Sequence, residues 1–470
     1  MTAAQRVAIV GAGPAGFYAA GFLLEAGLAV DLLDALPTPY GLVRAGVAPD
    51  HPKIKRVAKA YERTARRPGF RFFGGVALGR DIQRDELLAR YDAVVYATGM
   101  ATDNRLGIPG EDRPGSHPAT DFVAWYNGHP DHADRTFDLA VERAVVVGNG
   151  NVALDVARML VLDPDELAGT DIADHALEAL RAAQVEEVVV LGRRGPAQAA
   201  FTNPELLELG ELRGVDVVVD PADLELDERS AAWLDSDEAD RTRRRNVEIL
   251  RDYAARPAGG APRRIVLRFL RSPLEILPRG DGDEAVGALR IGRNRLVPDR
   301  RRAGALAAAP TGEEETIACG LVLRSIGYRG RPLPGVPFDA RRGLIRNVAG
   351  RVVDDDGRPL PGEYAVGWIK RGPSGVIGTN KADAADTVAQ LLADRDAGRL
   401  NVPAEPDPDG AATAAWLARR APEAVTWTGW QAIDAHETAL GAPHGRPRVK
   451  LVRVADLLDA ANGRVGTPAG

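Results

Sequence analysis

The sequence predicts an α/β protein built from two Rossmann-like three-layer domains. Two stretches carry this prediction, because each runs from a short apolar segment through a glycine-rich turn into a helical pattern. The first stretch covers residues 6–34 and the second covers residues 143–162. With 470 residues, of which 45% are hydrophobic and 27% are charged, the chain has the length and composition of two or three globular domains.

The first stretch predicts a strand over residues 7–10, a helix over 14–26 and a second strand over 29–33. In the turn, the first glycine allows a tight bend, the second lets a pyrophosphate approach the backbone, and the third permits close packing. The turn consists of Gly11, Ala12, Gly13, Pro14, Ala15 and Gly16. Asp34 follows the second strand, where a carboxylate can accept hydrogen bonds from a ribose. This combination predicts a dinucleotide site.

The second stretch predicts a strand over residues 143–147 and a helix over 151–162. Its turn consists of Gly148, Asn149, Gly150, Asn151, Val152 and Ala153. The following strand, predicted over 187–191, leads into Arg193 and Arg194, where an NAD-binding protein usually carries an acid. Two guanidinium groups suit the adenosine 2′-phosphate, so the sequence favours NADPH over NADH. The alternative is a solvated arginine pair on a turn.

The remaining segments predict further elements and one long functional loop, residues 36–55, which is rich in Pro and Gly with little periodicity. Strands are expected over residues 91–96, 321–326 and 364–369, and helices over 173–183, 378–392, 411–420 and 455–461. Residues 300–310 are expected to form a surface loop or a hairpin tip.

Two dinucleotide sites in one chain imply a bound flavin and a diffusing nicotinamide, because hydride transfer needs a donor ring and an acceptor ring. The first site is the better FAD candidate, since its turn and the later Ala97-Thr98-Gly99 are typical of FAD domains that host a second nucleotide-binding domain. The second site is then assigned to NADPH.

The composition excludes several kinds of redox site. Cys319 is the only cysteine, so the chain can form no intrachain disulfide, CxxC pair or self-ligated iron–sulfur cluster. We also expect no metal site at His129 and His132, because Pro130 lies between them and no ligand cluster supports them. The net charge of -6 gives no general attraction to nucleic acid or anionic lipid. Because a strand begins almost at once, leaving no room for a signal peptide, we expect a cytoplasmic location without membrane insertion.

Three segments resemble adrenodoxin reductase and its bacterial ferredoxin-NADP reductase relatives: residues 40–52, 192–202 and 367–379. The resemblance extends over about residues 6–387. It implies an FAD domain made of residues 1–105 and 333–470, with an NADP domain, residues 106–332, inserted between them. It also implies that Leu42, Trp368 and the backbone of residues 375–377 surround the isoalloxazine. The full set implied for this part of the cofactor site is Leu42, Val43, Trp368, Gly375, Val376, Ile377 and Thr379.

Residues 372–375 precede a predicted helix, so their N–H groups and the helix dipole could stabilise negative charge on a reduced flavin. The alternatives are a plain capping loop and, for Trp368, a place in the core. The resemblance further implies that His51 pairs with Glu208 across the domain interface and that Glu205 contacts NADPH. Because hydride transfer needs no general base, we expect a positional or electrostatic role for His51. The alternative is a surface histidine hydrogen-bonded within its loop.

A basic run could receive an acidic iron–sulfur protein, as the resemblance implies. It consists of Arg241, Arg243, Arg244 and Arg245. The alternative is a solvated helix face, and the acids at positions 235, 237, 238 and 240 dilute its field.

The resulting hypothesis is an NADPH-dependent FAD enzyme that passes electrons to a ferredoxin or adrenodoxin-like iron–sulfur protein. Alternatives are a flavin-dependent NADPH oxidoreductase with another acceptor, a monooxygenase, and a non-catalytic NADPH-binding module. The missing CxxC argues against a disulfide reductase. The acceptor, the direction of flux, the oligomeric state and the role of the tail from Pro403 stay open at this stage.

Overall fold

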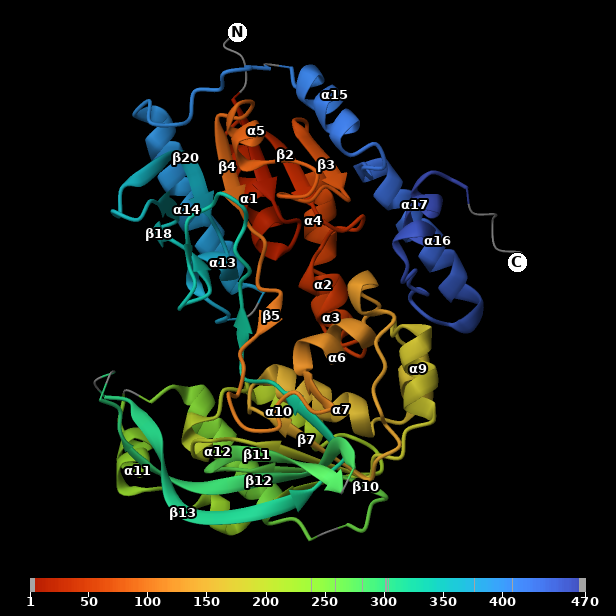
Figure 1. Cartoon of the computed structure of the whole chain (residues 1–470), viewed down its shortest axis with the longest axis vertical. Coiled ribbons are helices and arrows are strands. Elements are labelled where there is room, and N and C mark those ends of the chain that lie inside the picture. Colours follow the sequence, from red (N-terminus) through yellow and green to blue (C-terminus); the bar gives the residue numbers. More distant parts are fainter. Residues whose placement is uncertain are drawn as a thin grey trace.

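The computed structural model describes residues 5–237, 239–257, 259–280, 282–300, 302, 304–375, 377–407 and 409–464. Its strands form two main sheets, one above the other in Figure 1. The upper, seven-stranded sheet has the order β18-β19-β20-β4-β1-β2-β3. The lower, six-stranded sheet has the order β6-β14-β7-β8-β10-β9. The prediction of an α/β fold with two Rossmann-like units is confirmed.

The upper sheet joins the two ends of the chain. Its strands are β1 (Arg6–Val10), β2 (Ala29–Asp34), β3 (Phe70–Gly74), β4 (Ala93–Tyr96), β18 (Asn347–Val348), β19 (Arg351–Val353) and β20 (Pro359–Ala365). Strands β1 to β4 and β20 run parallel, and Tyr364 of β20 lies opposite Val95 of β4. Strand β20 therefore returns to a sheet that began more than two hundred residues earlier.

Helices cover both faces of this upper sheet. On one face α1 (Pro14–Glu25) packs beside α14 (Thr379–Asp396), and α4 (Ala58–Ala65) adjoins α1. Alternate residues of β1 point to opposite faces, so Val7 and Ile9 join the core under α1 whereas Ala8 and Val10 join the other core. Helix α15 (Ala411–Arg420) contributes Trp416 to that second core. The result is three layers.

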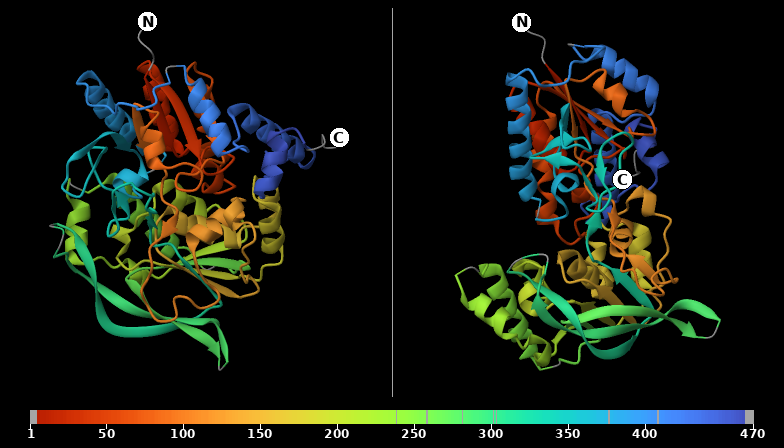
Figure 2. Two further views of the ribbon diagram at one scale, coloured as in Figure 1. Left: turned by 45° about the horizontal axis from the view of Figure 1, so that its top comes forward. Right: turned by 60° about the vertical axis from the view of Figure 1, so that its left-hand side comes forward.

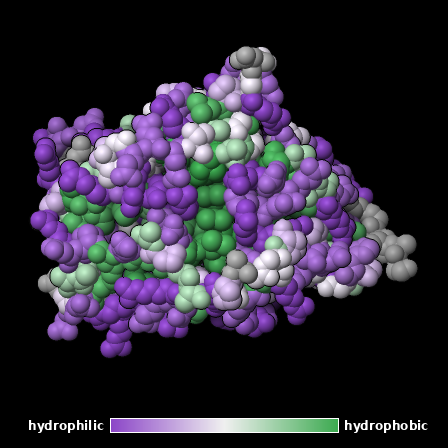
Figure 3. All heavy atoms as spheres, turned by 90° about the horizontal axis from the view of Figure 1, so that it is seen from below, coloured by the Kyte–Doolittle hydropathy of each residue, from purple (hydrophilic) through white to green (hydrophobic). Residues whose placement is uncertain are grey.

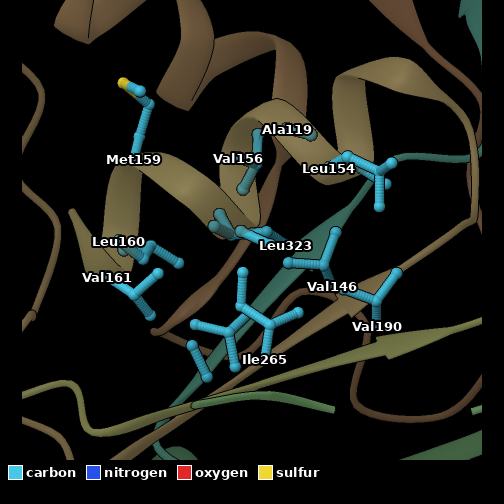
Figure 4. Close-up of a cluster of buried hydrophobic side chains, with 14 of the residues drawn as sticks. Ala119, Val146, Leu154, Val156, Met159, Leu160, Val161, Val190, Ile265 and Leu323 are labelled. Carbon is cyan, nitrogen blue, oxygen red and sulfur yellow. The ribbon is translucent and has the colours of Figure 1, made fainter. Parts of the chain in front are cut away.

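The lower sheet is entirely parallel. Its strands are β6 (Ser116–Pro118), β7 (Arg143–Val147), β8 (Glu187–Leu191), β9 (Val215–Val219), β10 (Arg263–Arg268) and β14 (Leu321–Arg324). Helix α7 (Asn151–Val161) lies across it, and Leu154 and Leu160 pack over Val146 and Ile265 (Figure 4). On the same side lie α6 (Ala119–Tyr126), α9 (Asp174–Arg181), α10 (Asn203–Leu209) and α12 (Arg241–Ala254).

The opposite face of the lower sheet is covered by a second sheet, which the sequence did not lead us to expect. It consists of β11 (Arg271–Gly280), β12 (Asp283–Pro298) and β13 (Leu306–Ala318), all antiparallel. Ile276 and Leu289 of this sheet pack on Val145 and Val147 of β7. Its strands project as a curved ribbon in Figure 2. The predicted loop or hairpin tip over residues 300–310 is confirmed in part, because β12 ends at Pro298 but residues 306–310 already belong to β13.

Two segments differ from the expected secondary structure. The predicted loop, residues 36–55, contains two short helices, α2 (Leu42–Ala45) and α3 (Pro52–Lys55). The predicted strand over 364–369 was wrong at its end, because β20 stops at Ala365 and Trp368 begins the short helix α13 (Trp368–Arg371). Gly367 between them has a φ of 74°, a left-handed conformation that turns the chain out of the strand.

The tail completes the fold, which answers the question that the sequence left open. Helix α16 (Trp427–Gly441) packs its tryptophans against aromatic rings of the first unit, with Trp430 5.5 Å from Tyr40. Glu437, which is fully buried, accepts a hydrogen bond of 2.8 Å from Arg44. Helix α17 (Val454–Ala461) packs on α16.

The described helices include none that is both long and apolar enough to cross a membrane. The apolar residues 11–33 are divided between α1 and β2. Seen from below, the molecule is mostly hydrophilic, and apolar residues show in a vertical band near the middle and in patches at the left (Figure 3).

Candidate functional site

The first glycine turn lies at the carboxyl edge of the upper sheet and is shaped by close backbone contacts. Gly11 has a φ of 113°, and a Cβ there would collide with the carbonyl of Ala97. A Cβ on Gly16 would collide with the carbonyl of Gly11. At Gly13, by contrast, the space around a Cβ is open to 4 Å. The turn therefore leaves room beside Gly13, at the N-terminus of α1, where a phosphate group would be stabilised.

Three other loops meet this turn, because β1, β2, β4 and β20 are parallel and end at the same edge. A Cβ on Gly41 would lie 3.0 Å from the Cα of Gly13, and one on Gly367 would lie 2.6 Å from the Cβ of Ala15. The loops before Leu42 and Trp368 thus converge at the start of α1. Ligands of open α/β sheets bind at such an edge.

Asp34 lies at the end of β2 and is hydrogen-bonded to the backbone. Its two carboxylate oxygens accept bonds from the N–H groups of Ala12 (2.7 Å) and Leu36 (2.9 Å). Burial raises its pKa to about 6, although the two backbone bonds act in the opposite direction. Each oxygen keeps a second acceptor position, so the predicted contact to a ribose is compatible with this geometry.

The segments around Leu42 and Trp368 contain half-buried and buried side chains. Leu42 is half-buried, whereas Val43 is 2% exposed and belongs to the core. The indole Nε1 of Trp368 is buried and has no hydrogen-bond partner among the residues that the structure describes. The ring of Tyr328 lies 5.3 Å from the Trp368 ring. An unsatisfied donor of this kind is available to a bound group.

The loop after α13 leads into α14. Gly372 and Gly375 have φ values of 96° and 78°, and a Cβ on Gly375 would collide with the side chain of Thr379. Ile377 packs against the core under α1. Val376, which the sequence placed in the cofactor site, lies outside the described residues. The long helix that the sequence predicted after residues 372–375 is present as α14.

The second glycine turn lies at the carboxyl edge of the lower sheet. Gly148 has a φ of 130°, and a Cβ there would collide with the carbonyl of Ser325. Gly150 is the N-cap of α7, and Asn151 and Val152 begin that helix. The Nδ2 of Asn149 is buried and makes no hydrogen bond within the described parts of the chain. The amide and the helix N-terminus provide donors for a phosphate or ribose.

Positive charge gathers beside this turn, after β8. Arg193 is exposed, and Arg194 Nη2 donates a bond of 3.3 Å to the carbonyl of Gln198. Burial and the nearby charges of Arg193, Arg243 and Arg302 lower the pKa of Arg194. Arg194 has no ion-pair partner among the residues that the structure describes. Such a group of cations favours the binding of an anion.

The four arginines of the basic run on α12 have different surroundings in the structure. Arg241 is exposed, and Arg245 pairs with Glu248 at 2.9 Å. Arg244 donates to the carbonyls of Leu234 and Ser236. Arg243 is half-buried, and its Nη1 has no partner among the described residues. The four arginines therefore do not form one uniform surface.

His51 and Glu208 are brought together from the two halves of the molecule. His51 Nε2 lies 2.8 Å from Glu208 Oε2, and His51 is 8% exposed. Burial lowers the pKa of His51, but the hydrogen bond to Glu208, together with the charges of Asp155 and Asp50, raises it, so that the net pKa lies above the ordinary value. The same bond lowers the pKa of Glu208. Both shifts favour an ion pair.

Arg158 of α7 is a residue of this site that the sequence analysis missed. Its side chain is 1% exposed, and its Nη2 lies 2.9 Å from His51 Nε2. It also donates to Asp50 (2.7 Å) and Asp155 (2.9 Å). The signal in the sequence was a single arginine within the apolar run of the helix over 151–162, since buried charges need partners.

Glu205 lies one turn before Glu208 on α10. Its carboxylate accepts a hydrogen bond from the hydroxyl of Thr202, and burial raises its pKa. It does not share the contact between His51 and Glu208, and its predicted contact to NADPH stays a prediction.

One wholly parallel sheet and one sheet that is parallel except for β18 and β19, each with a glycine turn and a helix N-terminus at its carboxyl edge, define a protein with two dinucleotide-binding folds. Comparison with known proteins agrees. The family described as pyridine nucleotide-disulphide oxidoreductase matches residues 5–194. NADPH-ferredoxin reductase FprA of Mycobacterium tuberculosis is 53% identical over 465 residues, covering 96% of this chain and 98% of that protein.

Two further comparisons extend the match over the whole chain. The mitochondrial NADPH:adrenodoxin oxidoreductase of Bos taurus is 43% identical over 467 residues, covering 96% of this chain and 91% of that protein. The solved structure of Mycobacterium tuberculosis FprA in complex with NADPH superposes with a TM-score of 0.90 at 52% identity, covering 98% of this chain and 100% of that one. The chain therefore belongs to the family of adrenodoxin reductase and the bacterial NADPH-ferredoxin reductases, which confirms the resemblance seen in the sequence.

Proposed function

We propose that the chain is an FAD-dependent NADPH:ferredoxin oxidoreductase whose acceptor is a ferredoxin or adrenodoxin-like iron–sulfur protein. FAD, when bound, accepts a hydride from NADPH at N5 and releases the two electrons one at a time. The observation that carries the proposal is the group of arginines beside the second glycine turn, which form no ion pair with the described residues, in a chain with a separate glycine turn on its other sheet. Relatives named for NADPH and ferredoxin support it.

The residues of the upper sheet fit FAD. The open space beside Gly13 suits the pyrophosphate, and Asp34 retains acceptor positions for the ribose. We assign Leu42 and Trp368 to the flavin ring, supported by the unsatisfied Nε1 of Trp368. The remaining residues that we assign to the FAD site are Gly11, Pro14, Ala15, Gly16, Val43, Gly375, Val376, Ile377 and Thr379.

The residues of the lower sheet fit NADPH. We assign Gly148, Asn149, Gly150, Asn151 and Val152 to its pyrophosphate and ribose, Arg193 and Arg194 to its 2′-phosphate, and Glu205 to a further contact with it. We add Arg243 to this list, supported by its Nη1, which has no partner among the described residues, and by its place in the cluster that lowers the pKa of Arg194. These arginines would favour NADPH over NADH, because NADH lacks the 2′-phosphate that they would bind.

The contact between His51 and Glu208 would fix the position of the FAD domain relative to the NADP domain. Hydride transfer requires the two rings to lie face to face, and a contact of 2.8 Å across the halves can maintain that geometry. We assign both residues a positioning and electrostatic role, without proton transfer. Buried Arg158 supports them by holding the loop through Asp50.

We propose an FAD domain of residues 1–105 and 333–470 and an inserted NADP domain of residues 106–332. Strands from both terminal parts form the upper sheet, and strands from the middle part form the lower sheet, which supports this division. A cytoplasmic location is also part of the proposal, because the single cysteine, Cys319, is buried and unpaired, as is usual in a reducing compartment.

We propose that the acidic partner docks on α12, through the run of Arg241, Arg243, Arg244 and Arg245. Arg241 is exposed, and Arg245 is exposed although it pairs with Glu248, so these two are the best placed to meet an acidic surface. Asp240 caps the helix by accepting a hydrogen bond from Thr242 N (2.9 Å). Arg243 and Arg244 would act mainly within the domain.

An anaerobic titration tests the proposed function. Addition of NADPH to the purified protein should bleach the flavin absorbance, and subsequent addition of a ferredoxin should restore it while the cluster spectrum changes. NADH should bleach the flavin at much higher concentration only. Flavin reduction without electron transfer to any iron–sulfur protein would contradict the acceptor half of the proposal, and a colourless protein would contradict all of it.

A further inference from the structure

Residues 40–59 are lined by a cavity on the side that faces away from the contact between the two units. We propose that this cavity binds a small organic phosphate with a doubly negative head and an apolar body. The cavity has a volume of about 380 Å³, which lies within the range of small-molecule sites. Its walls come from three parts of the chain: the segment of α2, α3 and α4, the loop before α9 with Asp171, and the tail with Trp430 and Lys450.

The cavity shares only Val43 with the residues that we assign to the dinucleotide sites. Its lining includes no residue of either glycine turn and none of residues 367–379. Arg44 of α2 and Lys55 of α3 line it, whereas His51, between these two helices, contacts Glu208 of the other unit. The segment therefore forms a wall with the cavity on one side and the contact between the two units on the other.

Two lysines form the buried end of the cavity. The side chain of Lys450 is 1% exposed, and its Nζ lies 3.3 Å from Asp171 Oδ2 and 3.2 Å from the carbonyl of Arg44. The Nζ of Lys55 lies 2.6 Å from Asp171 Oδ1. One carboxylate is thus shared by two ammonium groups. Burial lowers the pKa of both lysines, so an entering anion would stabilise their charged forms.

The lining carries more positive than negative charge. Its carboxylates are Glu62, Asp171 and Asp434, and its cations are Arg44, Lys55, Arg56, Lys59, Arg448 and Lys450. Arg44 pairs with Glu437 and Arg448 pairs with Asp434. Arg56 and Lys59 are exposed and have no ion pair among the described residues. This unneutralised charge at the opening would attract a dianion.

The cavity also offers an apolar wall and one free hydroxyl. The rings of Tyr40 and Trp430 are nearly perpendicular, with their centroids 5.5 Å apart, and Val43, Pro49 and Ala58 lie beside them. Tyr40 is 6% exposed, and its buried hydroxyl makes no hydrogen bond of acceptable geometry with the described residues. A ligand with an apolar body and a hydrogen-bonding head would satisfy both features.

Calorimetric titration of the FAD-loaded protein with phenyl phosphate tests this site. Saturating NADP⁺ is present throughout, so that the arginines beside β8 are already occupied. We expect one saturable site with a dissociation constant of about 1 mM or lower. Inorganic phosphate should bind more weakly because it lacks the apolar body, and phenol should not bind because it lacks the charge.

Matched surface variants keep the test independent of folding. The double variant R56Q/K59Q removes the two unpaired cations of the opening and should weaken binding of phenyl phosphate about tenfold. The control K53Q/R63Q removes two exposed cations of the same helices that do not line the cavity, and it should change binding less than about twofold. Absence of saturable binding, or equal weakening in the two double variants, would overturn the proposal. Neither result depends on electron transfer, so the proposed function is tested separately.

Discussion

His51 Nε2 and Glu208 Oε2 lie 2.8 Å apart, and this contact links the segment after α2 to helix α10 of the other unit. Burial disfavours the charged imidazole, but the bond to Glu208 and the charges of Asp155 and Asp50 together raise the pKa of His51. We expect Glu208→Gln to lower the pKa of His51, because only Asp155 and Asp50 would then be left to oppose burial and the charge of Arg158. An NMR titration of the His51 ring measures this shift. Glu205→Gln is the matched control and should have a smaller effect, whereas an unchanged pKa in Glu208→Gln would contradict the assignment.

The same pair predicts a window of pH dependence in stability. The raised pKa of His51 adds stability below its ordinary value of 6.5, which is lost as pH rises through the raised value. The lowered pKa of Glu208 adds stability above its ordinary value of 4.5, which is lost as pH falls through the lowered value. The pair should therefore contribute most between these values. Because Glu208 is 41% exposed, solvent screening limits the contribution to about 0.2–1 kcal/mol, measurable by denaturation of wild type and Glu208→Gln across pH.

Replacing Arg193 and Arg194 by glutamine should raise the KM for NADPH far more than the KM for NADH. Each lost charge-assisted hydrogen bond to the 2′-phosphate is worth about 1.5–3 kcal/mol, so kcat/KM for NADPH should fall by about a hundredfold or more. Steady-state kinetics with both cofactors and a dye acceptor measure the ratio. Equal losses for NADPH and NADH would show that these arginines do not contact the 2′-phosphate.

The division of the basic run on α12 predicts two different phenotypes. Arg243→Ala should raise the KM for NADPH about tenfold and leave the KM for ferredoxin unchanged, since its free Nη1 belongs to the cluster around Arg194. The variant R241A/R245A should instead raise the KM for ferredoxin at low salt, with a smaller effect at high salt. Assays of both substrates at two ionic strengths separate these outcomes. A common effect of both variants on ferredoxin alone would place Arg243 in the docking surface.

Arg158→Met should destabilise the protein by about 3–5 kcal/mol, because it leaves the carboxylates of Asp50 and Asp155 without their buried partner. Arg181→Met is the matched control, since Arg181 pairs with Asp165 at 3.4 Å and both side chains are at least half exposed. Its cost should stay below about 1 kcal/mol. Urea denaturation of the two variants measures the difference, and similar midpoints would show that Arg158 is not essential to the fold.

Gly13→Ala should separate cofactor binding from folding. The position has open space around a Cβ, so the variant should fold with a loss below about 1 kcal/mol. The added methyl group would occupy the space that we assign to the FAD pyrophosphate, and the flavin content of the purified protein should fall by about tenfold or more. Absorbance at the flavin band and thermal unfolding measure the two effects. Full flavin content would move the pyrophosphate away from Gly13.

The pattern of the sequence was sufficient where structure is local. The two glycine turns, their flanking strands and the helices after them depend on neighbouring residues only, and they occur where the sequence predicted them. Helix Ala411–Arg420 was predicted to the residue. The predicted end of β20 was wrong. The apolar run of the sequence continues through residues 366–369, but the chain turns at Gly367, where it approaches Ala15.

Long-range contacts were decided only by the tertiary structure. No local pattern shows that β20 pairs with β4, that β11 to β13 cover the lower sheet, or that the tail closes a cavity through Lys450 and Asp171. Arg158 shows how far the sequence could predict the site. The sequence contains a charge within an apolar helix, but two of its partners, Asp50 and His51, lie more than a hundred residues away. The sequence by itself determined the class of fold and the two glycine turns, because glycine spacing acts on adjacent backbone. The tertiary structure decided which charges meet, because the free energy of a buried charge depends on partners that only folding brings near.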